Sequence, residues 1–269
     1  MAALSNLEAY LARIGHHGEA SLATIHRAHA TSVPFENFES SAGRPIVLEP
    51  AWLEEKLVER RRGGYCFEQN LLLMAALTSI NVQEVTPMLA RVSNASSDEP
   101  GALNHLLLRV VDRGEEWLAD VGFGARGLLD PIPFVVGAES DQSGWRYRLV
   151  ERHPAIILQT HQDGAWTDVY GFVPQPAPMV DIEVNNWYTS THPSSPFVAG
   201  VIAGARRADR CLTFYQFGEP TFVEREVGQP EVTSVVSPDD VPSLLAERFD
   251  IDGVTLNAEG RAVIGGESP

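Results

Sequence analysis

The chain has 269 residues, of which 44% are hydrophobic and 21% are charged. This composition is ordinary for a globular protein of two or three packed sub-domains, and no stretch approaches the roughly 18 apolar residues that cross a membrane. The formal net charge is −16. That balance argues against nucleic acid or an anionic membrane as a partner, because phosphate binding needs a basic face. An anionic cofactor would need a local cluster of arginines or backbone N–H groups.

The first residues predict a helix of the mature protein and not a cleaved export signal. Residues 1–15 lack the basic start and the continuous apolar block of an export signal, and Ser5 and Glu8 have the spacing of a capping box. We therefore expect a cytoplasmic protein. Its two cysteines, Cys66 and Cys211, should be free thiols in that reducing compartment. A free cysteine is more often a small buried hydrophobe than a nucleophile, so its context must decide.

The first third of the chain has the sequence pattern of several helices separated by helix-breaking residues. Apolar residues recur at three- and four-residue spacing within each predicted helix, and glycines or Val33-Pro34 separate the helices. The predicted helices are 5–14, 20–31, 49–60 and 66–79. We expect residues 1–84 to form a helical domain.

The pattern changes at Val85 to short β-rich runs with turn residues between them. The predicted strands are 85–92, 102–111, 116–121, 145–152, 155–160 and 166–172. We expect an antiparallel sheet or small barrel over residues 85–180.

Residues 181–269 have a mixed pattern. Helices are predicted at 181–191, 194–203 and 238–249, and strands at 211–217 and 221–227. Ser237 and Pro238 suit the N-cap and first position of the last helix. The chain as a whole is predicted to be α+β.

Cys66 has the densest local signal. Gly63 and Gly64 permit a sharp turn, and an apolar-periodic helix begins directly after them. The thiol therefore lies at a helix N-terminus, where unpaired N–H groups and the macrodipole stabilise a thiolate. A buried core cysteine would explain the apolar residues that follow, but not the two glycines that precede it.

His105 is the best candidate for a base among the eight histidines. It lies within a β-run, 103–111, where an imidazole is unusual unless it faces a cavity or has a partner. The other histidines lie at helix ends, on amphipathic helices or near turns. A thiolate nucleophile needs such a base, and the base in turn needs a group that orients it.

Asp120 is the predicted orienting group. Residues 112–115 form a hairpin turn, and a turn centred between Asp112 and Arg113 would set His105 directly opposite Asp120, on the same face. A three-residue turn with a bulge at Gly114 would instead put the two residues on opposite faces.

Residues 122–127 hold three glycines around Arg126 at a strand end, where backbone N–H groups could approach phosphate oxygens. A flexible turn is the alternative. A dinucleotide-binding fold is excluded, because no helix pattern follows these glycines. No metal is expected either, because the chain has no CxxC or HExxH motif.

Five blocks resemble the arylamine N-acetyltransferases in sequence, order and spacing, over at least residues 33–198. They are VPFENF at 33–38, RRGGYCFEQN at 61–70, NHLLL at 104–108, DVGFG at 120–124 and, within 186–198, TSTHPSSPF at 189–197. The resemblance implies a helical bundle, a β-barrel and a C-terminal α/β lid over 181–269, around a cysteine-protease-like core.

The resemblance also implies a ping-pong acetyl transfer. The acetyl group of acetyl-CoA would form a thioester on Cys66 and pass to the nitrogen of an arylamine, arylhydrazine or arylhydroxylamine. His105 would hold Cys66 as an ion pair and assist proton movement, while Asp120 fixes the imidazole.

Further roles carry over by position. Those implied for the amine pocket are Phe38, Phe123 and Val92, although Phe38 could equally be a core residue. Those implied for the coenzyme A phosphates are Gly122, Gly124, Arg126 and Gly127. Glu36 and Arg62 resemble the ion pair that braces the active site of the family, and Asn70 a supporting asparagine.

Three other functions use the same residues. A cysteine hydrolase also employs Cys, His and a carboxylate. An amide synthase that releases a polyketide chain with an aromatic amine would share the fold, and a catalytically silent ligand-binding relative is the non-enzymatic alternative. The preferred amine and the oligomeric state, a homodimer included, stay open at this point.

Overall fold

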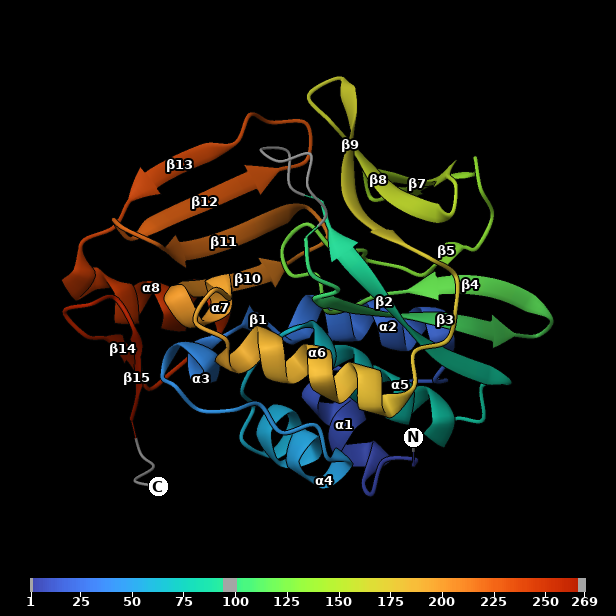
Figure 1. Ribbon diagram of the computed structural model, residues 1–269, viewed down its shortest axis with the longest axis horizontal. Coiled ribbons are helices and arrows are strands. Elements are labelled where there is room, and N and C mark those ends of the chain that lie inside the picture. The colour runs from blue at the N-terminus through green and yellow to red at the C-terminus, as the bar shows by residue number, and fades with distance from the viewer. Residues whose placement is uncertain (1, 94–100, 266–269) are drawn as a thin grey trace.

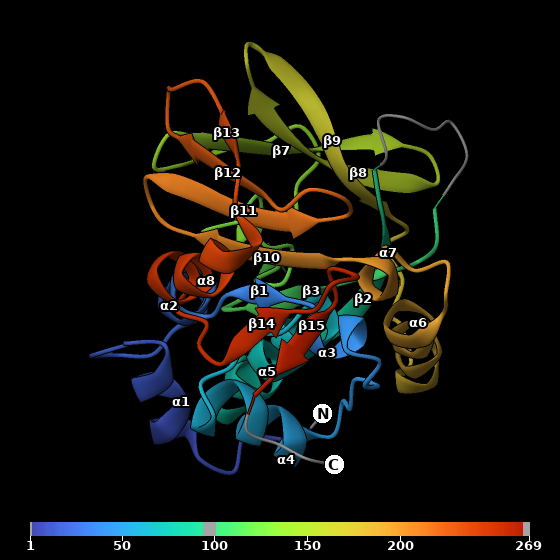
Figure 2. The same cartoon turned by 90° about the vertical axis from the view of Figure 1, so that its left-hand side faces the viewer.

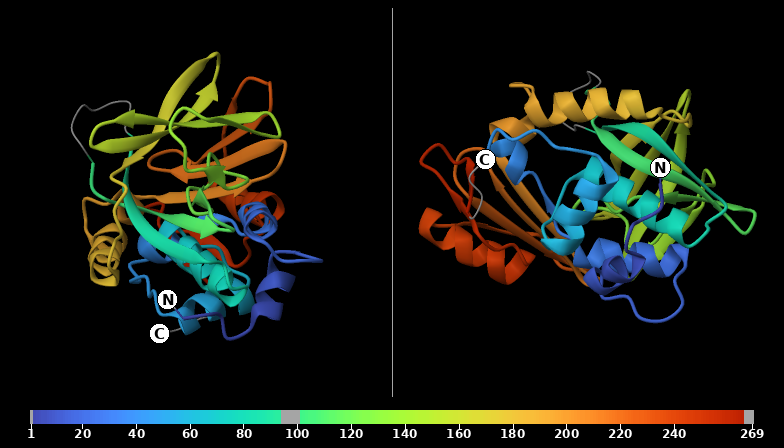
Figure 3. Two further views of the ribbon diagram at one scale, coloured as in Figure 1. Left: turned by 90° about the vertical axis from the view of Figure 1, so that its right-hand side faces the viewer. Right: turned by 90° about the horizontal axis from the view of Figure 1, so that it is seen from below.

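The computed structural model describes residues 2–93 and 101–265. Figure 1 shows the helices of the first third at the base, with two separate sheets above them. The same arrangement is seen from the two sides and from below in Figure 2 and Figure 3. The fold is therefore α+β, as predicted. No helix in the described residues is long and apolar enough to cross a membrane.

The N-terminal part is mainly helical. Its helices are α1 (Leu7–Arg13), α2 (Leu22–Ser32), α3 (Phe38–Ser41), α4 (Pro50–Leu53), the π-helix η1 (Glu54–Glu59) and α5 (Cys66–Ser79). The helices predicted at 5–14, 20–31 and 66–79 are confirmed, while the one predicted at 49–60 is divided into α4 and η1. The short helix α3 and the two-residue strand β1 (Phe35–Glu36) were not predicted.

The predicted capping box at Ser5 was wrong. Asn6 is the N-cap of α1, and its side chain accepts the backbone N–H of Ala9 at 3.0 Å. The hydroxyl of Ser5 donates instead to the carboxylate of Glu54, at 2.8 Å. A long-range partner on η1 has therefore replaced the local one.

Helix α5 is the centre of the largest hydrophobic cluster. All its residues from Cys66 to Leu77 are buried. A helix surrounded on all sides by protein is apolar all round. This explains the unbroken run of leucines that follows the cysteine.

The eight-stranded sheet, here called the barrel sheet, is antiparallel throughout and nearly closed. Its strand order is β5-β4-β3-β2-β9-β8-β7-β6. The strands are β2 (Glu84–Val92), β3 (His105–Asp112), β4 (Glu115–Ala119), β5 (Ile132–Pro133), β6 (Glu139–Gln142), β7 (Trp145–Arg152), β8 (Ala155–Gln162) and β9 (Ala165–Phe172). All six predicted strands are confirmed, and the short β5 and β6 were missed.

The five-stranded sheet, here called the lid sheet, has the order β1-β10-β11-β12-β13. The elements of the C-terminal part are α6 (Met179–Thr191), α7 (Pro196–Ala199), β10 (Val201–Arg206), β11 (Arg210–Gln216), β12 (Thr221–Glu226), β13 (Val232–Val235), η2 (Pro238–Asp240), α8 (Val241–Phe249), β14 (Val254–Leu256) and β15 (Ala262–Ile264). One face of the lid sheet packs against α8 in a separate core cluster.

The helix predicted at 194–203 was wrong beyond Ala199. The chain continues as strand β10 from Val201, and Gly204 of this strand pairs with Phe35 of β1. Both faces of β10 are covered, so its sequence is apolar on both sides and lacks the alternation that identifies a half-buried strand.

The predicted domains 1–84, 85–180 and 181–269 stay predictions, and their terminal residues Met1 and 266–269, like 94–100, lie outside the described residues. The structure adds one link across them. Strand β1 belongs to the first segment by sequence, yet it forms an edge of the lid sheet beside β10.

Truncation of Leu73 to alanine should lower the free energy of unfolding by about 2–5 kcal/mol, because this fully buried α5 side chain would leave a cavity. Urea denaturation followed by circular dichroism measures the change. Val232→Ala, at an exposed position on β13, is the control and should change stability by less than about 0.5 kcal/mol. Equal losses in the two variants would contradict the assignment of α5 as the centre of the core.

Candidate active site

Cys66 is the first residue of α5, and only 2% of its surface is exposed. The two glycines before it are needed for close approach. A Cβ at Gly63 would lie 2.4 Å from the carbonyl oxygen of Pro34, and one at Gly64 would lie 2.8 Å from the carboxylate of Glu68. Neither glycine has a positive φ. The two glycines are therefore needed because there is no room for a side chain, and not because the backbone makes a turn that only glycine can adopt.

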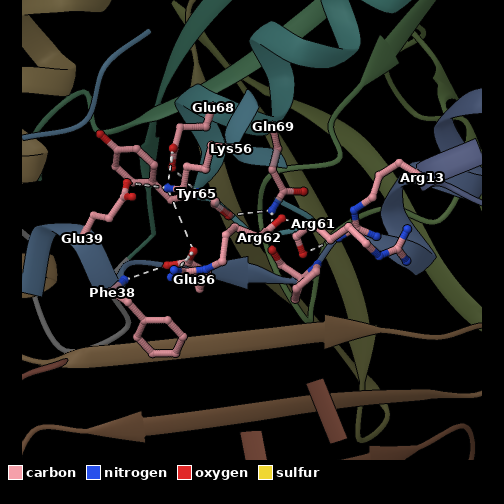
Figure 4. Close-up of polar contacts among 12 residues, drawn as sticks. Arg13, Glu36, Phe38, Glu39, Lys56, Arg61, Arg62, Tyr65, Glu68 and Gln69 are labelled. Atoms are coloured by element: carbon pink, nitrogen blue, oxygen red, sulfur yellow. Dashed lines mark hydrogen bonds and ion pairs between the residues drawn. The ribbon is translucent and has the colours of Figure 1, made fainter. Parts of the chain in front are cut away.

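Charged side chains fix the start of α5 from below (Figure 4). Glu68 accepts the backbone N–H of Tyr65 at 3.0 Å, which satisfies one free N–H group at the helix start. Lys56 donates to Glu68 at 2.6 Å and pairs with Glu39 at 2.7 Å. Because Lys56 and Glu68 are buried, these bonds give the first turn of the helix little freedom to move.

Glu36 and Arg62 lie close together, as the family resemblance implied. Their nearest side-chain atoms are 3.5 Å apart, and the Glu36 side chain is fully buried. The second Glu36 oxygen accepts the backbone N–H of Phe38 at 2.8 Å. The pair joins β1 to the segment that precedes Cys66.

His105 and Asp120 are in contact, with His105 Nε2 2.8 Å from Asp120 Oδ2. The predicted register was wrong. The hairpin turn is Arg113-Gly114, both with positive φ, so its centre lies one residue later than predicted. Continuing the observed pairing sets Leu107 opposite Asp120, and His105 is the diagonal neighbour of Asp120. A shift by two positions keeps both residues on the same face.

The Asp120 carboxylate has further partners. Its Oδ1 accepts from Asn70 Nδ2 and from the backbone N–H of Gly122, both at 2.9 Å. Asn70 also donates to the Leu106 carbonyl at 2.7 Å. The predicted supporting role of Asn70 therefore rests on contacts with both the carboxylate and strand β3.

His26 is a supporting residue that sequence reasoning missed. Its Nε2 accepts the backbone N–H of Asp120 at 3.0 Å, and its Nδ1 lies 3.0 Å from the carbonyl of Leu129. Burial lowers the pKa of His26 and keeps it neutral, which suits an acceptor. The sequence placed His26 on an amphipathic helix. The only sign of its burial was that His29, three residues later, lies on the same face of that helix.

The electrostatics of the pair favour an imidazolium beside a carboxylate. Burial opposes a charge on His105, but the Asp120 carboxylate and a hydrogen bond to Cys66 outweigh it and raise the His105 pKa to about 10. Burial likewise opposes the charge on Asp120, yet the pKa of Asp120 is lowered by His105 and by the bonds from Asn70 and Gly122. At neutral pH, His105 is therefore positively charged.

A cavity of about 510 Å³ opens beside the triad between the barrel sheet and the lid sheet. Cys66, His105, Phe123 and Val92 line it. The Phe123 ring packs edge-on against the imidazole of His105, with 5.2 Å between centroids. Phe123 and Val92 therefore both line the cavity that contains Cys66, and their role in binding an amine stays a prediction.

Phe38 is placed differently. Its side chain is fully buried in the core cluster of the lid sheet, with Val201 and Phe214, and it is not among the residues that line the cavity. Of the two readings that the sequence left open for Phe38, the structure places it in the core.

The glycine-rich turn after Asp120 lies directly against the nucleophile. A Cβ at Gly122 would lie 2.6 Å from Cys66 Cα, and Gly124 has a φ of +84°. Gly122, Gly124 and Arg126 line the cavity, while the carbonyl of Gly127 accepts from the Tyr147 hydroxyl at 2.9 Å. In the described part of the chain, no three His, Cys, Asp or Glu side chains form a metal-binding group.

Substitution Asp120→Asn should make His105 neutral at pH 7. Without the carboxylate, burial is the dominant influence on the imidazole, and its pKa should fall below 6.5. Nitrogen-15 NMR of labelled histidine measures the protonation state, with His105→Gln used to assign the signal. The wild-type signal should remain that of an imidazolium up to about pH 9. Wild-type titration near pH 6.5 would contradict the charge assignment.

Substitution Gly122→Ala should displace the Cys66 backbone or Asn70, because the added methyl group meets both within 2.7 Å. We expect a stability loss of about 1–3 kcal/mol and slower alkylation of Cys66 by iodoacetamide. Gly218→Ala is the matched control, since its Cβ meets no atom within 4 Å. Unchanged alkylation in Gly122→Ala would mean that this close approach does not position the thiol.

Comparison with known proteins gives consistent matches. The profile of the N-acetyltransferase family matches residues 20–257. The arylamine N-acetyltransferase of Mycolicibacterium smegmatis is 38% identical over 206 residues, 73% of this chain and 74% of that protein. The arylamine N-acetyltransferase of Mycobacterium tuberculosis is 34% identical over 265 residues, 95% of this chain and 92% of that protein.

Solved structures agree with these matches. The M. smegmatis arylamine N-acetyltransferase has a TM-score of 0.85 at 34% identity, covering 92% of each chain. The Mycobacterium marinum arylamine N-acetyltransferase in complex with CoA has a TM-score of 0.84 at 30% identity, covering 91% of this chain and 93% of that one. The profile spans most of the sequence, and the M. tuberculosis relative is 34% identical over 95% of it, so the chain belongs to the arylamine N-acetyltransferase family of acyltransferases.

Proposed function

We propose that this protein transfers an acetyl group from acetyl-CoA to the nitrogen of an arylamine, arylhydrazine or arylhydroxylamine through a thioester on Cys66. The observation that carries the proposal is the position of Cys66. Its thiol lies at the start of a buried helix, lines a cavity and contacts an imidazole that Asp120 holds in the charged form.

In the first half-reaction, the Cys66 thiolate attacks the carbonyl carbon of the donor thioester. The new bond joins Cys66 Sγ to the acetyl carbon, and the bond from that carbon to the coenzyme A sulfur breaks. The proton on the imidazolium of His105 passes to the departing coenzyme A thiolate. His105 thereby acts as the general acid, and Asp120 keeps its ring oriented.

In the second half-reaction, the amine nitrogen attacks the acetyl carbon on Cys66. The bond from that carbon to Cys66 Sγ breaks, while the now neutral His105 takes a proton from the nitrogen. The thiolate and the imidazolium are restored together. One pair of residues thus serves both halves of the cycle, and the acetyl-enzyme that links the two halves makes the mechanism ping-pong.

The cavity offers different surfaces to the two substrates. Phe123 and Val92 present apolar area close to Cys66, and we assign the aromatic ring of the amine to them. Gly122, Gly124, Arg126 and Gly127 are assigned to the donor, with Arg126 as the charge for its phosphates. The guanidinium of Arg126 lies at the cavity wall and is more than half exposed, and its ion pair with Glu231 is one that an anionic ligand can replace.

Transfer is favoured over hydrolysis by the burial of the reacting groups. Cys66 and His105 are each only 2% exposed, so a thioester on Cys66 would be largely shielded from bulk water. A hydrolase on the same core would need a path for water to that carbon. The matched relatives named above carry acetyltransferase names, which supports the same choice.

Acetylation of the protein by acetyl-CoA alone tests the proposal. Mixed without amine, the wild type should gain the mass of one acetyl group, and peptide mapping should locate it on Cys66. The addition of aniline should remove the label as acetanilide. Cys66→Ala should gain no label and lose transfer by at least about a thousandfold.

The peptide that contains Cys211 is the internal control and should stay unmodified. A wild-type enzyme that forms acetanilide without a labelled Cys66, or a Cys66→Ala variant that still forms it, would overturn the mechanism. Release of free acetate in place of acetanilide would favour the hydrolase.

A further inference from the structure

Three side chains form a row across the lid sheet on the face that borders the cavity. Arg206 of β10 pairs directly with Cys211 of β11, and Cys211 pairs with Arg225 of β12. Directly paired residues project from the same face of a sheet. Cys211 and Arg225 line the cavity. Two guanidinium groups therefore flank one thiol on a single wall.

Arg206 is a buried cation without a counter-ion. Only 3% of its surface is exposed, and no carboxylate in the described ranges lies within ion-pair distance of it. It donates to Cys211 Sγ at 2.8 Å and to the Tyr147 hydroxyl at 3.1 Å, and its Nε has no partner. Burial raises the pKa of Cys211, so the thiol does not neutralise Arg206. The guanidinium also lies over the Trp145 ring, 4.3 Å from its centroid, which offsets part of the cost of burial. No formal negative charge balances Arg206, so an anion bound nearby would be stabilised.

Arg206 does not itself line the cavity, but Arg225 and Arg126 do, and each is held by a carboxylate from the opposite wall. Arg225 is paired with Asp163 at the β8–β9 turn, at 2.6 Å, and the Asp163 side chain is 75% exposed. Arg126, in the turn after Asp120, is paired with Glu231, before β13, at 3.3 Å. The Arg225 side chain is only 11% exposed, but the carboxylate of each pair reaches solvent. A ligand anion that enters the cavity can therefore replace either carboxylate while the arginine stays in place.

The part of the cavity around these arginines carries a net positive charge, whereas the chain as a whole is acidic. Three guanidinium groups face two carboxylates here, in a protein whose formal net charge is −16. We name the region bounded by Arg126, Arg206, Cys211 and Arg225 the cationic arm of the cavity. Its local excess of positive charge selects for an anionic ligand.

The cationic arm lies away from the nucleophile. Ile202, which packs in the cluster of Cys66, and Arg206 are four residues apart on β10, and a strand rises about 3.3 Å per residue, which separates them by roughly 13 Å. An acetyl group on Cys66 cannot reach that far. A donor whose thioester lies at Cys66 and whose phosphates lie at the end of its flexible chain can reach both.

We propose that the cationic arm binds the phosphates of the acyl donor, with Arg225 and Arg126 in direct contact and Arg206 as the fixed charge behind them. The inference rests on the proposed function and names the residues that select a phosphorylated donor over the bare pantetheine thiol. In the absence of the donor, the carboxylates of Asp163 and Glu231 occupy the places of its phosphates beside Arg225 and Arg126.

Calorimetric binding of coenzyme A, 3′-dephospho-coenzyme A and pantetheine to the whole protein tests the inference. Arg225→Gln should raise the Kd for coenzyme A about tenfold, because a charge-assisted bond is lost, and should change the Kd for pantetheine by less than about twofold. It should also flatten the salt dependence of coenzyme A binding. An effect retained with the dephospho compound assigns Arg225 to the pyrophosphate, and a lost effect assigns it to the 3′-phosphate.

Arg146→Gln is the matched control. Arg146 is an exposed arginine of β7 that also pairs with a glutamate, Glu139, but it does not line the cavity. It should leave all three Kd values unchanged. Arg225→Lys keeps the charge and should restore part of the affinity, and a melting curve confirms that each variant is folded.

Equal losses of coenzyme A and pantetheine binding in Arg225→Gln would overturn the inference. So would a raised KM for 4-aminobenzoate with unchanged coenzyme A binding, since the arm would then hold the carboxylate of an acceptor. These outcomes leave the proposed function standing if the wild type still forms acetyl-Cys66. A wild type that takes no acetyl group from acetyl-CoA would instead remove the proposed function itself.

Discussion

The buried carboxylate of Asp120 is the contact on which the active site depends. It lies just past the end of β4 and joins two other parts of the fold, β3 through His105 and α5 through Asn70, while Gly122 holds it within its own loop. The backbone of the same residue is bonded to His26 of α2. A buried charge of this kind is tolerated only when its partners are all present. The contacts that pack α2 and α5 against the barrel sheet are therefore the same ones that assemble the active site.

Much of this arrangement could be predicted from short-range patterns. The start of α5 at Cys66 followed from two glycines and an apolar run, and the strands of the barrel sheet followed from their turns. The same-face relation of His105 and Asp120 survived an error in the hairpin centre, because the error was an even shift in register. Features that depend on residues close together in the sequence could therefore be predicted.

Features that depend on distant residues were not. His26 has no signal of its own, since its role exists only once α2 lies against the loop at Asp120. The start of strand β10 looked helical because Val201, Ile202 and Ala203 are all apolar and show no alternation, and its pairing with β1 is invisible in either segment alone. The same limit hid Arg206, whose burial in the absence of a carboxylate is a property of the assembled sheet. Tertiary context decided each of these cases.

Strand β1 has a consequence for the order in which the molecule is built. Phe35 and Glu36 are synthesised early, but their partners Gly204 and Ala203 emerge only after the whole barrel sheet has been translated. Long-range pairing of this kind is slow to form, and segments awaiting a partner are exposed to misassociation. The nascent chain therefore carries its nucleophile and its base well before the lid sheet can cover them. Cys66 is thus translated early but is covered last. Every residue of the ion-pair group beneath it, Lys56, Glu39 and Glu68, precedes the barrel sheet in the chain, so these contacts do not depend on the lid sheet.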